Sequence, residues 1–398
     1  MCGIAGWIDW EVDLSQHSST IERMTATLAH RGPDAQGCWL SPRAALGHRR
    51  LIVIDPEGGA QPMIYQTDAR TYALTYNGEL YNFRELRSEL TSHGHIFRTH
   101  SDTEVLLHAY IEWGEACVHH FNGIFAFGLW DEQKQQLLLA RDHLGVKPLF
   151  YAQRGSALLF GSELKALLAH PEVKAEIDTT GLAELFGFRR ALGSGVFRNV
   201  HELRAGHLLT VTSQRTRITR YWNVQSAQHP DDLPTTAEHL RALLEDIVKR
   251  QLISDRPVVS LLSGGLDSSG LAALAASNFK HAGKPLHTYT IDFVDNAQYF
   301  RHMPSSSQDL GWAQRVSTHL ASQHHVITVD TPDLVANLLA PLHAHDLPNM
   351  GQMETSLYLL FKAMKADATV ALSGESSDEI FGGYRWFHQE AILAAPTF

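Results

Sequence analysis

The residue with the clearest chemical potential is a cysteine directly after the initiator methionine, in the run Cys2-Gly3-Ile4-Ala5-Gly6. If Met1 is removed, the thiol and a free α-amine belong to one residue. Their ordinary pKa values, roughly 8.5 and 7.7–8.0, suit proton transfer at neutral pH. Cys2 is therefore a candidate nucleophile that carries its own general base, against the alternative of an ordinary disordered chain end.

A second group of polar residues lies beside apolar segments of the first 220 or so residues. Arg50 could clamp a carboxylate through two hydrogen bonds, whereas Glu79 and Asp102 could accept an ammonium group. The Asn77 side chain and the Gly78 amide could donate to a tetrahedral oxyanion. Together these residues predict a pocket for a zwitterionic amino acid. The alternative is that they form ordinary surface pairs of arginine and acid.

A glycine-rich loop, Ser263-Gly264-Gly265-Leu266-Asp267-Ser268-Ser269, follows a short apolar strand and precedes a helix. Glycines let the backbone approach a ligand, and the amides at a helix start bind anions. The serine hydroxyls add donors, and a bridging cation such as Mg²⁺ is the natural partner of Asp267 beside phosphate. Because no Gly-Lys-Ser/Thr follows, the loop predicts nucleotide binding without γ-phosphoryl transfer. The alternative is a serine-capped helix after a tight turn.

A second loop, Ser373-Gly374-Glu375-Ser376-Ser377-Asp378-Glu379, also follows an apolar strand. In a parallel sheet both loops open at the carboxyl edge of the strands, where ligands bind. The three acids of the second loop could hold Mg²⁺ or orient an amine-bearing substrate. The alternative is an acidic first turn favoured by the helix dipole.

The bulk composition excludes several classes of protein. The net charge is −10 with no long basic run, which argues against nucleic-acid binding. The three cysteines, Cys2, Cys38 and Cys117, are too few and too widely spaced to form a disulfide framework. No signal peptide opens the chain, and no apolar run reaches about 18 residues, so the sequence predicts a cytoplasmic protein that does not span a membrane.

The pattern of elements predicts two domains. In the first, residues 123–130 with 136–140 and residues 148–152 with 157–160 read as hairpins of an α+β domain. The polar stretch 223–236, which contains Pro230 and Pro234, reads as a linker before an amphipathic helix over 237–251. Strands at 257–262, 287–293, 325–329 and 368–372 then alternate with helices, which predicts a parallel, doubly wound α/β sheet.

In combination these motifs resemble those of the glutamine-dependent asparagine synthetases, over essentially the whole chain. The matching segments, in the family's order, are 2–6, 30–34, 50–55, 77–82, 101–104, 141–149, 263–268 and 373–384. The resemblance implies an αββα sandwich of the N-terminal-nucleophile hydrolase type over residues 2–222 and a linker over 223–236. It implies an α/β ATP-pyrophosphatase domain over 237–398 that is incomplete at its C-terminus.

The resemblance also implies roles for individual residues. Cys2 corresponds to the glutaminase nucleophile, with Asn77 and Gly78 as the oxyanion hole. Glutamine contacts fall on Arg50, Val53, Asn77, Gly78, Glu79 and Asp102. ATP contacts fall on Leu262, Ser263, Gly264, Gly265, Asp267, Ser268, Ile291, Ser373 and Gly374. Glu375 corresponds to a residue that assists formation of an acyl-adenylate, and Asp267 and Asp378 to positions that hold Mg²⁺ through pyrophosphate.

The implied reaction hydrolyses glutamine to ammonia and uses ATP to convert aspartate to asparagine, with AMP and pyrophosphate released. A homodimer fits the family. Two departures from the family are Ser376, where glycine is frequent, and His143, where proline is usual. Family members also continue into a helical C-terminal part that contributes a lysine. Two alternatives stay open at this point: an amidotransferase for another carboxylate acceptor, or a chain with glutaminase function only.

Overall fold

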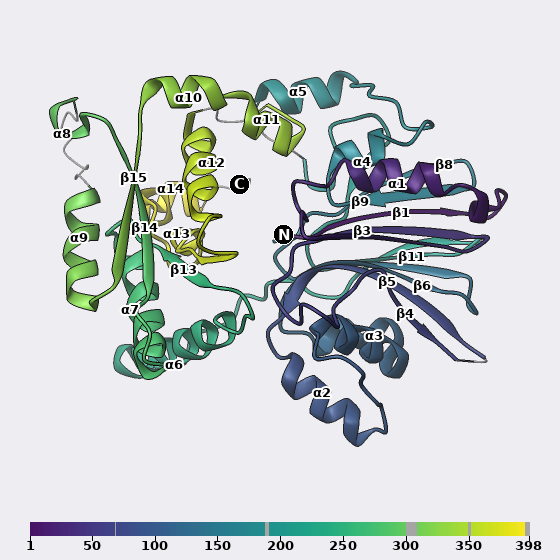
Figure 1. Ribbon diagram of the computed structural model, residues 1–398, viewed down its shortest axis with the longest axis horizontal. Helices are drawn as coiled ribbons and strands as arrows, with labels where there is room; N and C mark the ends of the chain where they lie inside the picture. The colour runs from purple at the N-terminus through teal and green to yellow at the C-terminus, as the bar shows by residue number, and fades with distance from the viewer. Residues whose placement is uncertain (68, 188–190, 300–308, 349–351, 395–398) are drawn as a thin grey trace. The chain divides into compact units, whose positions relative to one another are not determined.

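The computed structural model describes residues 1–67, 69–187, 191–299, 309–348 and 352–394 (Figure 1). The chain folds into two compact units, one of Met1–His229 with Leu342–Asn349 and one of Pro230–Pro341 with Met350–Phe398. The two units are called unit 1 and unit 2 below, and each is described by itself.

Unit 1 is built on two six-stranded sheets. The first has the order β10-β8-β9-β1-β3-β2, and the second the order β12-β11-β7-β6-β5-β4. All the strand pairs in both sheets are antiparallel among the residues described. The strands of the first sheet are β1 (Gly3–Asp9), β2 (Ala35–Leu40), β3 (Ala44–Arg50), β8 (Phe150–Arg154), β9 (Ala157–Gly161) and β10 (His201–Glu202). Those of the second are β4 (Met63–Gln66), β5 (Thr71–Leu80), β6 (Gly123–Asp131), β7 (Gln136–Arg141), β11 (His207–Val211) and β12 (Thr216–Arg220).

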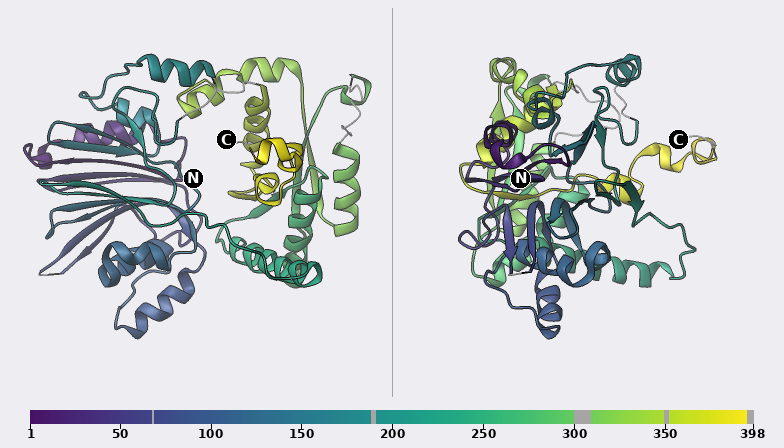
Figure 2. Two further views of the ribbon diagram at one scale, coloured as in Figure 1. Left: turned by 180° about the vertical axis from the view of Figure 1, so that it is seen from behind. Right: turned by 90° about the vertical axis from the view of Figure 1, so that its right-hand side faces the viewer.

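Helices cover the outer faces of both sheets. Helices α1 (Ser18–Ala26) and α4 (Leu164–Leu168) contact the first sheet, through β1 and β3 and through β8 and β9 respectively. Helix α3 (Asp102–Trp113) contacts β4 and β5 of the second sheet, and α2 (Phe83–Ser92) contacts α3. The layers of unit 1 are therefore helix, sheet, sheet and helix, as both views of the ribbon show (Figure 2), and the predicted αββα sandwich is confirmed.

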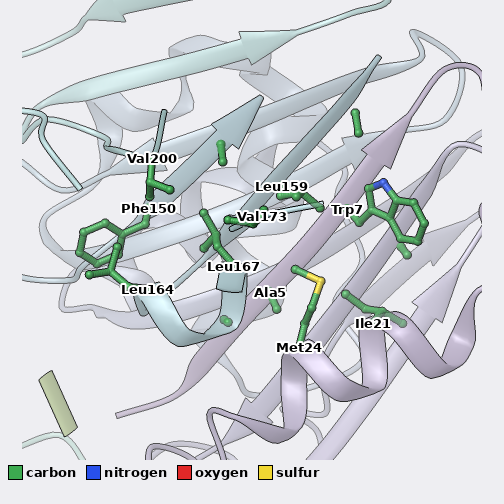
Figure 3. Close-up of a cluster of buried hydrophobic side chains, with 14 of the residues drawn as sticks. Ala5, Trp7, Ile21, Met24, Phe150, Leu159, Leu164, Leu167, Val173 and Val200 are labelled. Carbon is green, nitrogen blue, oxygen red and sulfur yellow. The ribbon is translucent and has the colours of Figure 1, made fainter. Parts of the chain in front are cut away.

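Strand alternation divides the core of unit 1 into separate layers. Along β1, Ile4 and Ile8 point between the two sheets, where they meet Leu46 and Ala73. The intervening Ala5 points to the opposite face and joins a cluster under the helices (Figure 3). Successive side chains of a strand point to opposite faces, so one strand serves both layers. Because β1 is buried on both faces over its whole length, the position of the residue just before it is closely defined.

The local hairpins of unit 1 form as the sequence predicts. Strands β6 and β7 pair in register from Asp131 with Gln136 to Ala126 with Arg141, and β8 pairs with β9 from Arg154 with Ala157. Both connections are short turns, and Gly155 in the second has a φ of +56°. A left-handed conformation of this kind is one that glycine adopts without strain.

Unit 2 contains a four-stranded, wholly parallel sheet in the order β15-β14-β13-β16. Its strands are β13 (Val258–Leu261), β14 (His287–Phe293), β15 (Gln323–Val329) and β16 (Val370–Leu372). Helices α6 (Leu233–Gln251), α7 (Leu266–His281) and α9 (Asp309–Leu320) bury one face in a common cluster, to which Val248, Ala272 and Ala313 contribute. Helix α12 (Gln352–Met364) covers the other face through Leu360 and Met364. The predicted parallel α/β sheet is confirmed.

The helix after the predicted linker begins earlier than expected. The pattern predicts a start at residue 237, whereas α6 begins at Leu233. The Asp232 side chain accepts a hydrogen bond from Thr235 N at 2.9 Å, and Pro234 occupies the first turn, where a missing N–H is harmless. The proline that suggested a linker is therefore part of the helix start. Within the described residues, no helix has the length and apolar character to cross a bilayer.

Candidate active sites

Cys2 lies at the start of β1, where its thiol contacts the loop after β3. Its Sγ accepts a hydrogen bond from Leu51 N at 3.4 Å and lies 3.6 Å from Leu51 O. Burial raises the pKa of the thiol, while the Leu51 amide and the charges of Lys147 and Arg50 act in the opposite direction. The balance of these influences decides how much thiolate the site contains.

Arg31 fastens the start of the chain to the body of unit 1. Its Nε donates to Cys2 O at 2.9 Å, and its Nη1 donates to Glu163 Oε1 at 2.7 Å. Burial opposes ionisation of Glu163, but hydrogen bonds from His30 and Lys165 and the charge of Arg31 outweigh it and lower the pKa of Glu163 to about 2. The carboxylate is therefore charged at neutral pH and holds the arginine that holds Cys2.

Arg50, the predicted carboxylate clamp, ends β3 and is 7% exposed. Three of its N–H groups already donate to main-chain carbonyls of the following turn, those of Ile54, Asp55 and Pro56. A guanidinium has five N–H donors, so capacity for a ligand remains. Val53 lies in that turn, and the Asp55 carboxylate also fixes it by accepting from Gly58 N at 2.8 Å.

The predicted oxyanion residues Asn77 and Gly78 lie in β5. Asn77 is 1% exposed, and its Nδ2 has no hydrogen-bond partner among the described residues. A buried donor without a partner is costly, so an acceptor is expected at this point when the site is filled. Gly78 pairs with Phe125 of β6, and a Cβ at this position would lie 2.7 Å from Phe125 Cα. Only glycine allows the two strands to approach so closely.

The two predicted ammonium acceptors, Glu79 and Asp102, influence one another. Burial, reinforced by the charge of Asp102, raises the pKa of Glu79 to about 7. Burial also raises the pKa of Asp102, even though its Oδ2 accepts from Tyr76 Oη at 2.9 Å and from Leu80 N at 3.1 Å. A cationic group bound here would favour the ionised form of both acids.

The structure adds a residue that the sequence reasoning did not select. Lys147, in the loop between β7 and β8, is 8% exposed, and the charges that act on its ammonium include those of Glu79, Arg31 and Cys2. In the sequence it is marked only by its place in the matching segment 141–149, between the apolar Val146 and Pro148, and no role was assigned to it there. Burial alone distinguishes such a lysine from an ordinary surface residue.

The glycine-rich loop of unit 2 links the end of β13 to the start of α7. Gly264 has a φ of +88°, and a Cβ there would lie 2.6 Å from Ala313 N, so close packing on α9 requires glycine. Ser263 and Ser268 close the loop, because their hydroxyl oxygens lie 2.9 Å apart and Ser263 N donates to Ser268 Oγ at 3.2 Å. The neighbouring Ser269 hydroxyl is buried and has no partner among the described residues.

The two predicted loops of unit 2 lie side by side. Strand β16 pairs with β13, and a Cβ at Gly374 would lie 3.1 Å from both Asp267 Cβ and Ser268 N. In the order β15-β14-β13-β16, the neighbours β13 and β16 are where the direction of the sheet's winding reverses. Ligands of doubly wound sheets bind outside this point, which is where both glycine loops lie.

The remaining predicted residues of unit 2 surround the same edge of the sheet. Ile291 lies in β14, and Leu262, which follows β13, is 1% exposed and donates its N–H to Tyr289 O. Glu375 N donates to Ser373 Oγ at 3.1 Å, and Asp378 lies in the first turn of α13 (Ser377–Phe381). Ser376, where related sequences frequently have glycine, has a left-handed φ of +71°. In the described ranges, no group of three or more His, Cys, Asp or Glu side chains is arranged to hold a metal ion.

Comparison with known families agrees with this division of the chain. The family model described as a glutamine amidotransferase domain matches residues 1–222, and the model described as asparagine synthase matches residues 239–398. Among solved structures, a glutamine phosphoribosylpyrophosphate amidotransferase from Bacillus subtilis has a TM-score of 0.43 and 20% identity, covering 72% of this chain and 65% of that one.

Three curated relatives illustrate the extent of the match. Asparagine synthetase [glutamine-hydrolyzing] 3 of Bacillus subtilis is 49% identical over 98% of this chain and 64% of its own length. A putative asparagine synthetase of Methanocaldococcus jannaschii is 32% identical over 100% of this chain and 79% of its own length. The asparagine synthetase of Sandersonia aurantiaca is 32% identical over 98% of this chain and 68% of its own length. The chain spans slightly under two thirds of the length of the Bacillus relative.

Unit 1 is an αββα sandwich with a cysteine directly before β1, and the amidotransferase model matches it. These features define a glutamine amidotransferase with an N-terminal-nucleophile fold. The asparagine synthase domain follows in the same order as in the relatives. The chain belongs to the family of glutamine-hydrolysing asparagine synthetases.

Proposed function

We propose that unit 1 hydrolyses glutamine with Cys2 as nucleophile. The Cys2 thiol gives its proton to the α-amine that Met1 removal exposes, and the sulfur attacks the side-chain amide carbon of glutamine. The amine then returns the proton to the departing nitrogen, which leaves as ammonia, and water hydrolyses the thioester to glutamate. While Met1 is present, burial lowers the pKa of the α-amine at this end of β1; the same burial would keep the Cys2 amine unprotonated at neutral pH and able to accept the thiol proton.

The observation that carries this proposal is the unpartnered side-chain amide of Asn77. It is buried in β5, and β5 contacts both β1, which begins directly after Cys2, and β3, which ends at Arg50. An oxyanion that forms on the glutamine amide carbon would satisfy Asn77 Nδ2 together with the Gly78 amide. Arg50, Glu79, Asp102 and the turn at Val53 then bind the carboxylate and ammonium of the substrate.

For unit 2 we propose that ATP activates the β-carboxylate of aspartate. The carboxylate attacks the α-phosphorus, pyrophosphate leaves, and ammonia later displaces AMP to give asparagine. The loop of Ser263–Ser268 and the adjoining Ser373 and Gly374 bind the phosphates, Leu262 and Ile291 contact the nucleotide, and Glu375 assists formation of the adenylate. The unpartnered Ser269 hydroxyl at the start of α7 is a donor that a phosphate oxygen could satisfy.

Mg²⁺ is the cation proposed for this second site. The Asp267 Cβ lies against the loop that leads to Asp378, and Mg²⁺ is usually held by one or two carboxylates together with phosphate oxygens and water. Asp267 and Asp378 would hold the ion through pyrophosphate, and the ion would neutralise charge on the leaving group.

We also propose a homodimer in the cytoplasm; sedimentation velocity of the purified chain tests its subunit number.

The test uses labelled substrate and two cysteine variants. With ¹⁵N-amide glutamine, aspartate, ATP and Mg²⁺, mass spectrometry should detect labelled asparagine from the wild-type chain. Cys2→Ala should lose this product but still form asparagine from added ammonia. Cys38→Ala is the matched control, because Cys38 is a free, exposed cysteine of the same unit, and it should behave as wild type.

Each other outcome contradicts part of the proposal. Glutamine-dependent product from Cys2→Ala would exclude Cys2 as nucleophile. AMP release without asparagine would indicate a different carboxylate acceptor, and ammonia release without AMP would leave the glutaminase alone. Intact-mass measurement should show that Met1 is absent, and an active chain that retains Met1 would exclude catalysis by the Cys2 amine.

A further inference from the structure

Lys147 is a largely buried lysine whose ammonium has no hydrogen-bond partner among the residues that the structure describes. It is 8% exposed, and across the residues that the structure describes its Nζ has neither a hydrogen bond nor a carboxylate within 4 Å. Only its main chain is bonded. Burying an unpaired charge costs free energy, so packing by itself favours an apolar residue at this position.

The loop that carries Lys147 is rigidly held. The buried Asp142 carboxylate accepts from Lys147 N and Val146 N, both at 2.9 Å. The Arg141 side chain donates to Lys147 O at 2.8 Å and to Gly145 O at 2.7 Å. These two side chains fix the main chain of the loop, and in that conformation the Lys147 side chain is buried.

The same carboxylate places this loop beside the glutaminase residues of β5. Asp142 Oδ2 also accepts from Phe125 N at 3.3 Å, and Asp142 N donates to Phe125 O at 2.8 Å. Phe125 pairs with Gly78, and the next residue, Ile124, pairs with Glu79. Asp142 therefore links Lys147 to Phe125, which is paired in register with Gly78 of β5, the strand that carries the predicted oxyanion hole.

Charged groups from several elements lie near enough to act on the Lys147 ammonium. Glu79 of β5, Arg31 of the loop after α1, Cys2 before β1 and Asp142 all act on the Lys147 charge. Cys2 in turn lies within the influence of Lys147, Arg50 and the terminal amine, and Glu79 within that of Asp102, Lys147 and the terminal amine. Arg50 has three carbonyl acceptors and Arg31 has a carbonyl and a carboxylate, so Lys147 differs from both in having no acceptor.

We propose that Lys147 is a further residue of the glutaminase site and that its ammonium stabilises the thiolate of Cys2. The inference rests on the proposed role of Cys2 as nucleophile. When the thiol proton moves to the α-amine, negative charge appears on sulfur in a buried site, and a fixed cation nearby favours that charge. The same cation disfavours protonation of the amine before the thiol proton arrives. Lys147 thus acts through Cys2 and does not need to touch glutamine.

The experiment measures alkylation of Cys2 by iodoacetamide, with peptide mass spectrometry, from neutral to alkaline pH. In Lys147→Met the apparent pKa of Cys2 should rise by about one pH unit, and alkylation at neutral pH should slow by up to about tenfold. Lys147→Arg keeps the charge and should stay near wild type. Lys134→Met removes a lysine whose side chain is 58% exposed in the same unit and should change nothing. Cys38, which is exposed, provides an internal reference within each sample.

Each outcome supports or overturns the inference. A Cys2 alkylation profile in Lys147→Met that equals that of Lys134→Met would overturn it. Loss of folding in Lys147→Met would overturn it too, because an unpartnered charge replaced by an apolar chain of similar length should not weaken the fold. Alkylation requires no glutamine, so a chain that hydrolyses none but shows the displaced profile would refute the proposed function and, with it, Lys147 as a residue of a glutaminase site, and would leave only the effect of Lys147 on the Cys2 thiol.

Discussion

Replacing Glu79 by glutamine should make unit 1 more stable near and above neutral pH while weakening glutamine binding. Glu79 lies near the end of β5, where burial and the charge of Asp102 raise the pKa of its carboxyl from 4.5 to about 7. Lys147 and the terminal amine act in the opposite direction without restoring the ordinary value. The folded chain therefore ionises this residue less readily than the unfolded chain does.

The size and sign of the effect on the free energy of unfolding follow from the pKa of Glu79 in the folded chain and from its ordinary value. They differ by 2.5 pH units (7 minus 4.5), which at about 1.4 kcal/mol per unit corresponds to at most roughly 3–4 kcal/mol in the free energy of unfolding. Between pH 4.5 and 7 the folded chain retains a proton that the unfolded chain has released. The contribution of Glu79 to the free energy of unfolding therefore falls as pH rises through this interval and levels off above about 7. Glutamine at this position does not titrate, so the variant should gain on wild type over the same interval.

Urea denaturation of the full chain measures this difference. The transition that exposes Trp130, which is fully buried in unit 1, should be followed for wild type and Glu79→Gln on both sides of neutrality. Glu89→Gln on the exposed face of α2 is the matched control and should follow wild type at every pH. A stability difference between wild type and Glu79→Gln that does not change with pH would refute the reasoning from burial.

The same variant tests the site. Loss of a charged acceptor for the substrate ammonium should raise the KM for glutamine roughly 10- to 100-fold, the equivalent of about 1.5–3 kcal/mol. Activity with added ammonia should be unchanged, since Glu79 belongs to unit 1. An unchanged KM for glutamine would show that Glu79 does not bind the ammonium group.

Two further substitutions test the loops that build the sites. Asp142→Ala should lower the free energy of unfolding by about 3–5 kcal/mol in urea denaturation. The reason is that four main-chain amides lose their acceptor, those of Phe125, Leu144, Val146 and Lys147. A loss below about 1 kcal/mol would contradict this prediction. Gly264→Ala should reduce ATP–pyrophosphate exchange by at least about tenfold, because the added Cβ forces the loop to shift away from α9. Glutaminase activity should stay unchanged. Gly270→Ala in α7 is the control for Gly264→Ala, because an added Cβ there would meet nothing within 4 Å; equal exchange in the two variants would exclude the steric argument.

Local patterns in the sequence were sufficient to predict much of the secondary structure. The hairpin of β6 and β7 and strand β14 form where alternation and turn residues place them, because both signals act over a few residues. The start of α6 was missed because Pro234 was interpreted as a linker residue and not as the first turn of a helix. The pairing of β1 with β3 and β9 joins segments far apart in the chain, and no local pattern encodes it.

The residues of the candidate sites likewise fall into those that local sequence could identify and those that it could not. Cys2, Asn77, Glu79 and the glycine loops could be selected from residue types next to apolar strands. The importance of Asp142 could not, because it depends on which main-chain amides the fold brings to its carboxylate. Nor could the sequence show that three N–H groups of Arg50 are used by the turn that follows it.

The order of residue types along this chain was by itself sufficient to predict a terminal thiol, an amino-acid pocket and a loop for phosphate, since these predictions depend on chemistry and short spacings. Only the tertiary structure decided the electrostatic state of those groups. The raised pKa of Glu79, the unpartnered amide of Asn77 and the buried ammonium of Lys147 all arise from burial and from neighbours supplied by distant segments. The physical reason is that the energy of a charge or a hydrogen-bond donor depends on the whole environment around it, and the fold creates that environment.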